Sequence, residues 1–451
     1  MKKTDHQTWD WLRGYTRDHG ASPQDLDIFD EVSSRRQFFG KVGKSGAALA
    51  LLGFGAGTEA ALQGLFGRGM IPMAWASDAE GVADEQAKQV LGEASKEGLI
   101  VHNERPLNAE TPPHLMGDAV TPIKRHFIRN NDLVSERALR KNPQGYKLEI
   151  EGEVNNPVSF TLDELQAMNT VTYRLPIECG GNGRAYFDPA PRGNQWKNGA
   201  IGNSEWTGVP LRELLNAAGL KDTAVYTAHY GEEPILGDRP PFSRGIPIDK
   251  AMEEHTLVAF KMNGEDIPAV HGYPVRLVVP GWYGSTSHKW LNRIVVRDRE
   301  HDGRGMTGYS YRVPKYPVAP GARPPEEDMV VGGPWRIKSV ITGPAADSEF
   351  RVGQTIKVTG QAWAGEDVVE EMWVSTDFGL NWKKAKLGRP HNKYSWQQWE
   401  TDVKFDGRGY YEIWARGVDN KGNTQPIAQP WNPRGYDGNL VHRIPIMVEP
   451  A

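Results

Sequence analysis

The sequence predicts an α+β domain followed by an immunoglobulin-like β-sandwich. Strand patterns and short helix patterns mix between residues 121 and 318, whereas nearly every segment after residue 334 reads as a short strand bounded by a turn. Glycine and proline make up about 18% of the chain, against roughly 12% in an average protein, which favours a loop-rich protein with many strands. The length of 451 residues is enough for two or three domains.

The α+β domain is predicted over residues 119–320. Its expected elements, in order, are strands within residues 147–160, a short helix opening at 162–165, a second helix at 211–215 and a buried strand over 273–280. Residues 77–118 are polar and helix-leaning and then proline-rich, which is typical of a leader segment that wraps over a domain.

A linker and the β-sandwich complete the predicted chain. Residues 321–334 are acidic and rich in proline and glycine, as linkers are. The expected strands cover residues 354–359, 372–375, 399–403, 411–415 and 440–448. Turn signals such as Asp377-Phe378-Gly379 separate them. Residues 335–451 therefore predict a sandwich of about 120 residues.

Residues 1–76 predict an export signal. The pair Arg35-Arg36 precedes Phe38 and Phe39, an uncharged stretch covers residues 46–58, and residues 74–76 form an A-x-A cleavage site. Paired arginines before such a run resemble the twin-arginine signal, which addresses bacterial proteins that fold before export. The apolar run is too short to span a membrane. We therefore expect a periplasmic protein without a membrane anchor, and export in the folded state suits a cofactor inserted beforehand.

The composition of the chain excludes several kinds of cofactor and partner. The chain has one cysteine, Cys179, and a formal net charge of −4. One cysteine excludes an intramolecular disulfide, a thiolate-rich zinc site, an iron–sulfur cluster and a C-x-x-C-H haem attachment. The near-neutral charge argues against nucleic acid as a partner. Redox chemistry on this chain would have to use another cofactor.

Cys179 lies directly before a glycine-rich turn that ends at Arg184. Glycines let the backbone approach a bulky ligand, a thiolate is a soft ligand for transition metals, and an arginine binds anions. The residues alone leave three interpretations open: a metal ligand, a buried free cysteine behind a turn, and the nucleophile of a Cys/His hydrolase.

Four motifs, in order along the chain, resemble the sulfite oxidase family of molybdenum enzymes. The cysteine loop is residues 179–184, and residues 126–131 are similar to the family's F-x-R-N-H segment. Residues 271–291 are similar to the stretch around the pterin, and residues 431–435 to the W-N-x-R-G motif. The resemblance covers residues 120–445. It implies a sulfite-oxidase-type molybdopterin domain followed by a dimerisation domain.

The resemblance also implies a molybdenum–molybdopterin cofactor, with Cys179 as the protein thiolate on the metal. The cofactor-binding residues that it implies are Phe127, Ile128, Arg129, Asn130, Asn131, His271, Arg276, Ser287, His288 and Lys289. The cationic groups among them would meet the phosphate of the cofactor.

On the substrate side, the resemblance implies that Arg129, Arg184 and Arg434 converge on a sulfur oxyanion, because guanidinium forks fit oxyanions bidentately. Tyr311 aligns with the family's active-site tyrosine, and Tyr309 is the second candidate. Asn131 stands where many family members have histidine, so we expect proton handling beside the metal to differ.

The implied reaction is oxidation of a sulfur substrate, sulfane sulfur or sulfite, by oxygen-atom transfer, as in bacterial thiosulfate oxidation. The sequence has no haem-binding His-Pro-Gly-Gly module. We therefore expect no haem on this chain, a c-type cytochrome subunit as electron acceptor, a sulfur-carrier protein that presents the substrate, and a homodimer of this subunit. Two alternatives stay open: a dehydrogenase for free sulfite, and an exported binding or scaffold protein without activity.

Overall fold

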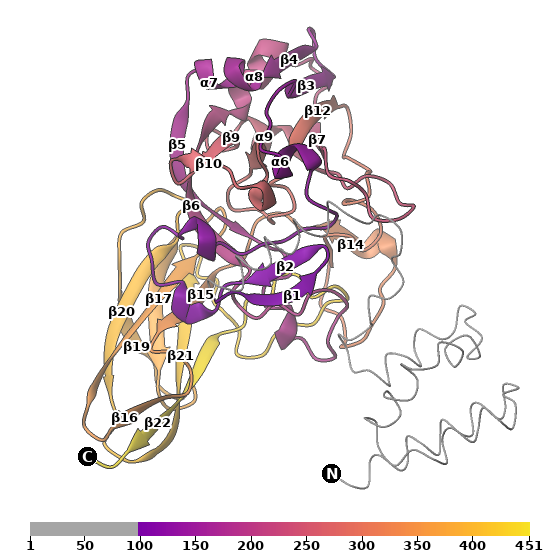
Figure 1. Ribbon diagram of the computed structural model, residues 1–451. Helices are drawn as coiled ribbons and strands as arrows, with labels where there is room; N and C mark the ends of the chain where they lie inside the picture. Colours follow the sequence, from indigo (N-terminus) through magenta and orange to yellow (C-terminus); the bar gives the residue numbers. More distant parts are fainter. Residues whose placement is uncertain (1–97) are drawn as a thin grey trace, which may run out of the picture. The chain divides into compact units, whose positions relative to one another are not determined.

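Three large sheets dominate residues 98–451, the part of the chain that this computed structural model describes (Figure 1). Two have five strands, one has eight, and two small sheets have two strands each. The mixture of sheets and short helices confirms the predicted α+β class. The predicted export signal and the helix-leaning part of the leader lie outside the described residues. Across residues 98–451, every helix is too short or too polar to cross a membrane.

The elements before residue 332 are short. They are β1 (Ile100–Glu104), β2 (Leu107–Glu110), η1 (Pro113–Leu115), η2 (Ile123–Arg125), α6 (Glu136–Leu139), β3 (Lys147–Gly152), β4 (Val158–Thr161), α7 (Leu162–Ala167), β5 (Val171–Glu178), η3 (Arg184–Tyr186), β6 (Ile201–Pro210), α8 (Leu211–Ala218), β7 (Tyr226–Gly231), β8 (Arg244–Pro247), α9 (Ile248–Met252), β9 (Leu257–Met262), β10 (Glu265–Asp266), η4 (Ala269–His271), β11 (Arg276–Val278), β12 (Leu291–Arg297), β13 (Arg312–Pro314), η5 (Glu326–Asp328) and β14 (Met329–Val331).

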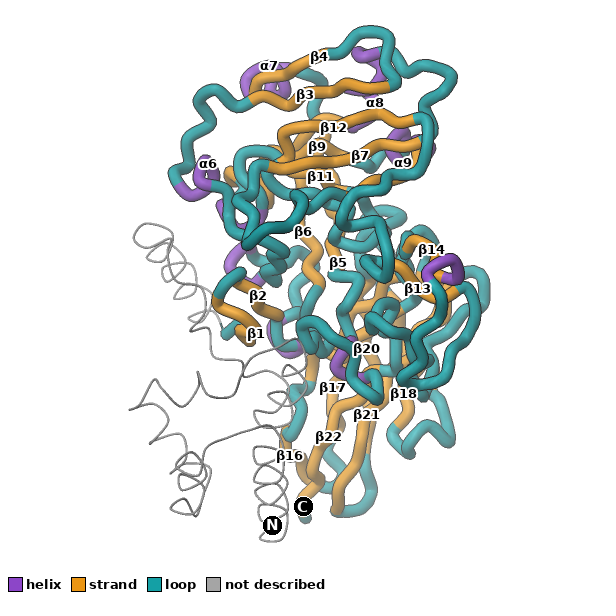
Figure 2. Tube along the Cα trace, turned by 90° about the vertical axis from the view of Figure 1, so that its right-hand side faces the viewer, coloured by secondary structure: helices purple, strands orange, loops and turns teal. Residues whose placement is uncertain are grey.

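One five-stranded sheet has the order β10-β9-β6-β5 with β11 beside β9, and the other has the order β4-β3-β12-β7-β8. Apolar side chains of both sheets and of the helices form one core. In α8 the residues Leu211, Leu214, Leu215 and Ala218 are buried, which is the spacing of one helix face. Figure 2 shows β5 and β6 running from these sheets toward the C-terminal strands. Those two strands carry the cysteine loop.

Both helices predicted for this domain are present as α7 and α8. Thr161 begins α7 with a capping box to Glu164, in which each residue satisfies a backbone N–H of the other. The strand predicted over residues 273–280 is shorter in the structure, where β11 covers only Arg276–Val278. Pro274 and Pro280 flank it, and proline has no N–H to donate to a sheet.

The C-terminal sheet has the order β15-β17-β20-β19-β18-β21-β22-β16. Its strands are β15 (Lys338–Gly343), β16 (Ser348–Arg351), β17 (Thr355–Trp363), β18 (Val369–Ser375), β19 (Lys383–Leu387), β20 (Gln397–Lys404), β21 (Gly409–Asp419) and β22 (His442–Glu449). All five predicted strands are present, and β15, β16 and β19 are additional. β19 pairs with both β18 and β20 and so joins the two halves of the sandwich in one hydrogen-bonded path. Inward-facing apolar residues of both halves form the core.

His442 on β22 predicts a loss of stability in acid. Its Nδ1 accepts a hydrogen bond from the Ile341 N–H at 2.9 Å, and burial lowers the pKa of His442 from 6.5 to about 4. Below pH 6.5 the unfolded chain binds a proton that the folded chain refuses until about pH 4, so stability falls as the pH decreases through this window. The loss reaches about 3 kcal/mol.

We expect His442→Gln, which keeps an acceptor but cannot titrate, to lose less stability than the natural protein between pH 7 and pH 4.5. Urea denaturation at the two pH values measures the difference. Equal losses in the two proteins would show that His442 is not a source of the acid sensitivity.

Candidate active site

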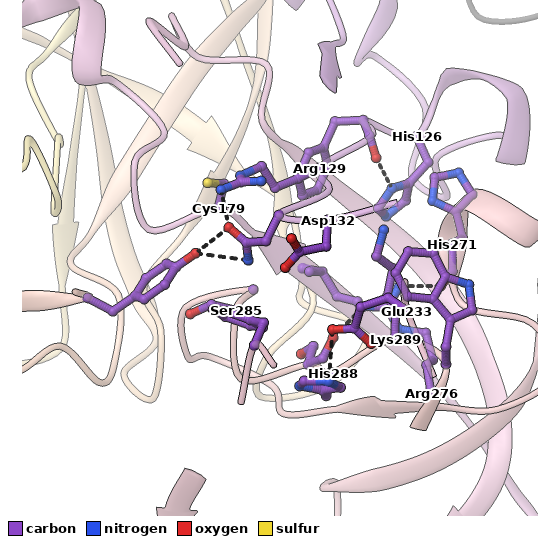
Figure 3. Close-up of a pocket in the computed structure, with 18 residues that line it drawn as sticks. His126, Arg129, Asp132, Cys179, Glu233, His271, Arg276, Ser285, His288 and Lys289 are labelled. Carbon is purple, nitrogen blue, oxygen red and sulfur yellow. Dashed lines mark hydrogen bonds and ion pairs between the residues drawn. The ribbon is translucent and has the colours of Figure 1, made fainter. Parts of the chain in front are cut away.

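One pocket of the described chain has about 720 Å³ of empty space, part of it open to solvent (Figure 3). Four segments meet there: the residues after η2, the end of β5, the loop between β7 and β8, and the stretch from η4 to the start of β12. Tyr311 completes the lining just before β13. The sequence motifs that lie far apart along the chain thus come together around one pocket.

Cys179 is the first residue after β5 and is 8% exposed. Its N–H donates to the Ala200 carbonyl at 2.9 Å, and its carbonyl accepts from the Asn182 N–H at 2.8 Å. The glycines of the loop are needed for close packing. A Cβ atom at Gly180 would lie 2.7 Å from the Tyr283 ring, and one at Gly181 would lie 2.2 Å from the Arg184 guanidinium. The backbone therefore holds the thiol in one place on the pocket lining.

Arg129, Asn131 and Tyr311 form a hydrogen-bonded group on the pocket lining. Arg129 Nη2 donates to Asn131 Oδ1 at 2.6 Å, and Asn131 Nδ2 donates to the Tyr311 hydroxyl at 3.3 Å. Burial opposes a charge on Arg129, but Tyr311 and Cys179 outweigh it and raise the pKa of the guanidinium. Figure 3 shows the Arg129 side chain beside the sulfur of Cys179. The second candidate, Tyr309, is absent from the lining, and its hydroxyl donates to the Pro324 carbonyl.

A cluster of buried basic side chains, which we call the cation cluster, consists of His271, Arg276 and Lys289. Arg276 donates to the carbonyls of His271 at 2.7 Å and Ser287 at 2.9 Å, and Lys289 donates to the carbonyl of Val270 at 2.8 Å. These acceptors carry no charge. Burial lowers the pKa of Arg276 to about 9, and burial together with the neighbouring cations lowers the pKa values of Lys289 and His271 well below their ordinary values. The cluster is therefore built for an anion.

Several residues that line the pocket were not predicted from the sequence. Glu233 Oε2, Ser285 Oγ and His126 Nε2 are buried and have no hydrogen-bond partner within residues 98–451. His126 and Ser285 lie inside the recognised motifs, so the motif boundaries were a usable signal. Glu233 lies just after β7, where no sequence pattern indicates a site. The other unassigned lining residues are Asp132, Ile177, Phe242, Gly284 and Trp290.

Two residues expected to bind the cofactor do not line the pocket. Ile128 pairs through its backbone with Ala109 and packs its side chain in an apolar cluster that includes Leu107. Asn130 donates to the Leu107 carbonyl at 2.9 Å and accepts from Lys289 Nζ. Strand-like backbone alternates its side chains, which turns these two residues away from the pocket that Phe127, Arg129 and Asn131 line. Ile128 and Asn130 therefore hold neighbouring segments of the protein together and do not face the pocket.

The expected convergence of Arg184 and Arg434 with Arg129 on a sulfur oxyanion stays a prediction. Arg184 Nε donates to the Arg434 carbonyl at 2.8 Å, and Arg184 Nη1 donates to the Asn194 carbonyl at 2.9 Å. Gly193 and Gly435 pack against its side chain. Neither Arg184 nor Arg434 lies on the pocket lining. Of the three arginines, Arg129 lies on the lining. Arg184 interacts electrostatically with Cys179, Arg129 and Tyr311, and Arg434 Nε is buried without a hydrogen-bond partner within residues 98–451.

Comparison with known proteins agrees with this geometry. Residues 136–304 match the oxidoreductase molybdopterin binding domain, and residues 334–449 match the Mo-co oxidoreductase dimerisation domain. The crystal structure of the sulfane dehydrogenase SoxCD from Paracoccus pantotrophus is similar, with a TM-score of 0.64 and 27% identity over 83% of this chain and 92% of that chain. Fold and site together define a molybdopterin-dependent oxidoreductase.

Curated relatives identify the family. Sulfite oxidase of Gallus gallus is 32% identical over 368 residues, which cover 77% of each protein. Mitochondrial sulfite oxidase of Homo sapiens is 32% identical over 372 residues, 78% of this chain and 66% of the human protein. NADH nitrate reductase of Volvox carteri is 30% identical over 77% of this chain and 43% of its own length. The chain belongs to the sulfite oxidase family.

The pocket fits the molybdopterin cofactor that this family implies. The cation cluster is suited to the phosphate, because an anion there would offset the burial and the mutual repulsion that lower the pKa values of Lys289 and His271, and the burial that lowers the pKa of Arg276. The buried, unpaired Oε2 of Glu233 is an acceptor suited to the N–H groups of a pterin. Cys179 lies on the same lining, and its sulfur would be the soft ligand for the metal.

Proposed function

We propose that this chain is the molybdenum subunit of a periplasmic, SoxC-like dehydrogenase. It oxidises a sulfur substrate, sulfane sulfur or sulfite, and passes the electrons to a c-type cytochrome subunit. The observation that carries the proposal is that Cys179, Arg129 and Tyr311 line the same pocket as the cation cluster. The likeness to a sulfane dehydrogenase over most of both chains supports it.

Molybdenum–molybdopterin, with Cys179 on the metal and the cation cluster at the phosphate, supplies two-electron redox chemistry and oxygen-atom transfer when bound. Arg129 binds the sulfur oxyanion, because its charge is maintained and its guanidinium fork is oriented in advance by Asn131. Burial raises the pKa of Tyr311 despite the nearby Arg129, so its phenol stays protonated and donates a hydrogen bond to an oxygen at the reacting centre.

The same proposal includes the localisation of the protein, the roles of its domains and its partners. The twin-arginine signal exports the folded subunit to the periplasm, and residues 335–451 hold two copies together. The match to a dimerisation domain over residues 334–449 supports the homodimer. Residues 119–320 bind the cofactor, residues 321–334 link the two domains, and a sulfur-carrier protein presents the substrate.

Cytochrome c reduction by the purified subunit with its cytochrome tests the substrate class. We expect one molybdenum and one pterin per chain, and faster turnover with a persulfide on a carrier protein than with sulfite. The control is the same mixture without a sulfur substrate, which should give no cytochrome reduction. A chain without molybdenum would contradict the proposal and leave the scaffold protein as the explanation.

A dehydrogenase for free sulfite is the second candidate, and the sulfite oxidases among the relatives favour it. The same assay decides between the two. Turnover with sulfite alone, without a gain from the carrier-bound persulfide, would replace the sulfane dehydrogenase by this second function.

A further inference from the structure

Tyr311 has an unfavourable backbone conformation. Its φ is +52°, in the left-handed region that bulky residues other than glycine rarely adopt. Such conformations persist where the surrounding structure holds them, and they gather at functional sites. Two hydrogen bonds hold Tyr311: its carbonyl accepts from the Gly332 N–H at 2.8 Å, and its N–H donates to the Tyr436 hydroxyl at 3.2 Å. The second bond comes from a side chain more than a hundred residues away.

The ring of Tyr311 is held as firmly as its backbone. It stacks on the Tyr436 ring with a centroid separation of 5.4 Å and an interplanar angle of 15°. The Arg244 guanidinium carbon lies 5.0 Å from the same ring centre, and the Phe242 ring lies 5.9 Å away, edge to face. These contacts direct the phenol toward Asn131 on the pocket lining.

Tyr436 is itself immobilised. It is buried, its carbonyl accepts from Asn432 Nδ2 at 2.7 Å, and its N–H donates to Asn432 Oδ1 at 3.1 Å. Arg184 lies over its ring at 5.4 Å and donates to the Arg434 carbonyl in the same turn. Arg184, which lies off the pocket, therefore clamps the turn that presents Tyr436 to Tyr311.

We propose that Tyr436 is a positioning residue for the reaction. Its hydroxyl holds the Tyr311 backbone in the left-handed conformation, and its ring fixes the Tyr311 phenol beside Arg129. The inference rests on the proposed function, in which Tyr311 donates to the reacting centre. Residues 334–449 match a dimerisation domain, so that domain contributes to the geometry of the catalytic tyrosine as well as to assembly.

Tyr436→Phe in the complete, cofactor-loaded protein tests the inference, because it removes the hydroxyl and keeps the stacked ring. We expect the Tyr311 amide to exchange with deuterium about tenfold faster. We also expect kcat to fall about tenfold with little change in KM. A factor of about ten corresponds to the free energy of one hydrogen bond. Hydrogen-exchange mass spectrometry across residues 307–313 and cytochrome reduction measure the two effects. Molybdenum content should equal that of the natural protein.

The matched control is Tyr309→Phe, which removes the same group from a tyrosine that donates to the Pro324 carbonyl. It should change neither the exchange at Tyr311 nor kcat. In a Tyr311→Phe background, Tyr436→Phe should cost no further activity, because Tyr436 acts through Tyr311.

Unchanged exchange at Tyr311 in Tyr436→Phe would overturn the inference. Faster exchange with an undiminished kcat would also overturn it, since the held conformation would then not serve the reaction. If the natural protein oxidises no sulfur substrate, the proposed function fails, while the exchange measurement still decides whether Tyr436 holds Tyr311.

Discussion

Replacing Cys179 by serine should abolish sulfur oxidation while leaving the fold intact. The backbone hydrogen bonds that fix this residue, to Ala200 and from Asn182, do not involve the sulfur, so serine retains them. A hydroxyl does not replace a soft thiolate on a transition metal. Loss of a residue that holds a metal ligand in place typically lowers metal affinity or activity about 10- to 100-fold. Loss of the ligand itself should therefore lower kcat by more than about 100-fold.

Steady-state cytochrome reduction measures the loss, and far-ultraviolet circular dichroism with thermal unfolding checks the fold. Cys179→Ala should lose activity to the same extent, which separates the missing thiolate from any effect of the new hydroxyl. Sulfur oxidation within a few-fold of the natural rate by either variant would contradict the assigned role of Cys179.

The predicted site residues that lie on the pocket lining come mostly from motifs in which a short stretch of backbone sets the position of the side chains. The glycines after Cys179 predicted a close approach to a bulky ligand, and in the structure Gly180 and Gly181 pack closely against the side chains of Tyr283 and Arg184. Arg129 and Asn131 lie two residues apart and both reach the pocket. In such segments the local chain determines which side chains share a face.

The contacts of long side chains, and the positions of loops that have no recognisable sequence pattern, could not be predicted from the local chain. Arg184 donates from Nε and Nη1 to the carbonyls of Arg434 and Asn194, and only the tertiary structure shows these contacts. Glu233 reaches the lining because the loop after β7 folds over the pocket. Tyr436 follows the recognised W-N-x-R-G motif directly, but its contact with Tyr311 depends on how two distant segments pack.

Strand predictions behaved similarly. Short strand-forming segments separated by turn signals located β17, β18, β20, β21 and β22. β19 (Lys383–Leu387) is mostly lysine and has only one buried residue, Ala385, so its composition did not indicate a strand. Its place between β18 and β20 is set by pairing with neighbours.

A buried ion pair connects the C-terminal sheet to the cysteine loop. Lys338 Nζ on β15 lies 2.7 Å from Glu178 Oε1, and the two side chains are 5% and 4% exposed. Trp363 Nε1 donates to the other Glu178 oxygen at 2.7 Å, and Asn182 Nδ2 donates to Oε1 at 2.8 Å. Glu178 is the residue directly before Cys179, so this network sits immediately behind the thiol.

Lys338→Met should destabilise the protein by about 3–5 kcal/mol, because it leaves the Glu178 carboxylate buried without its counter-charge. Urea denaturation measures the loss. The double variant Lys338→Met/Glu178→Gln should recover much of it, since neither partner then carries an unpaired charge. The matched control is Lys357→Met, whose partner Glu400 lies 2.7 Å away on the exposed face of the same sheet, and it should change stability little.

The same network should affect how well the metal is held. Because Glu178 and Asn182 bracket Cys179 and both contact Lys338, an unpaired Glu178 will move or draw water into the backbone that fixes the thiol. We therefore expect Lys338→Met to retain less molybdenum than the natural protein, and the double variant to retain more than Lys338→Met. Metal analysis of the purified folded proteins measures this. If the stability losses of the single variants simply add in the double variant, and molybdenum content does not change, the ion pair has no role in holding the cysteine loop.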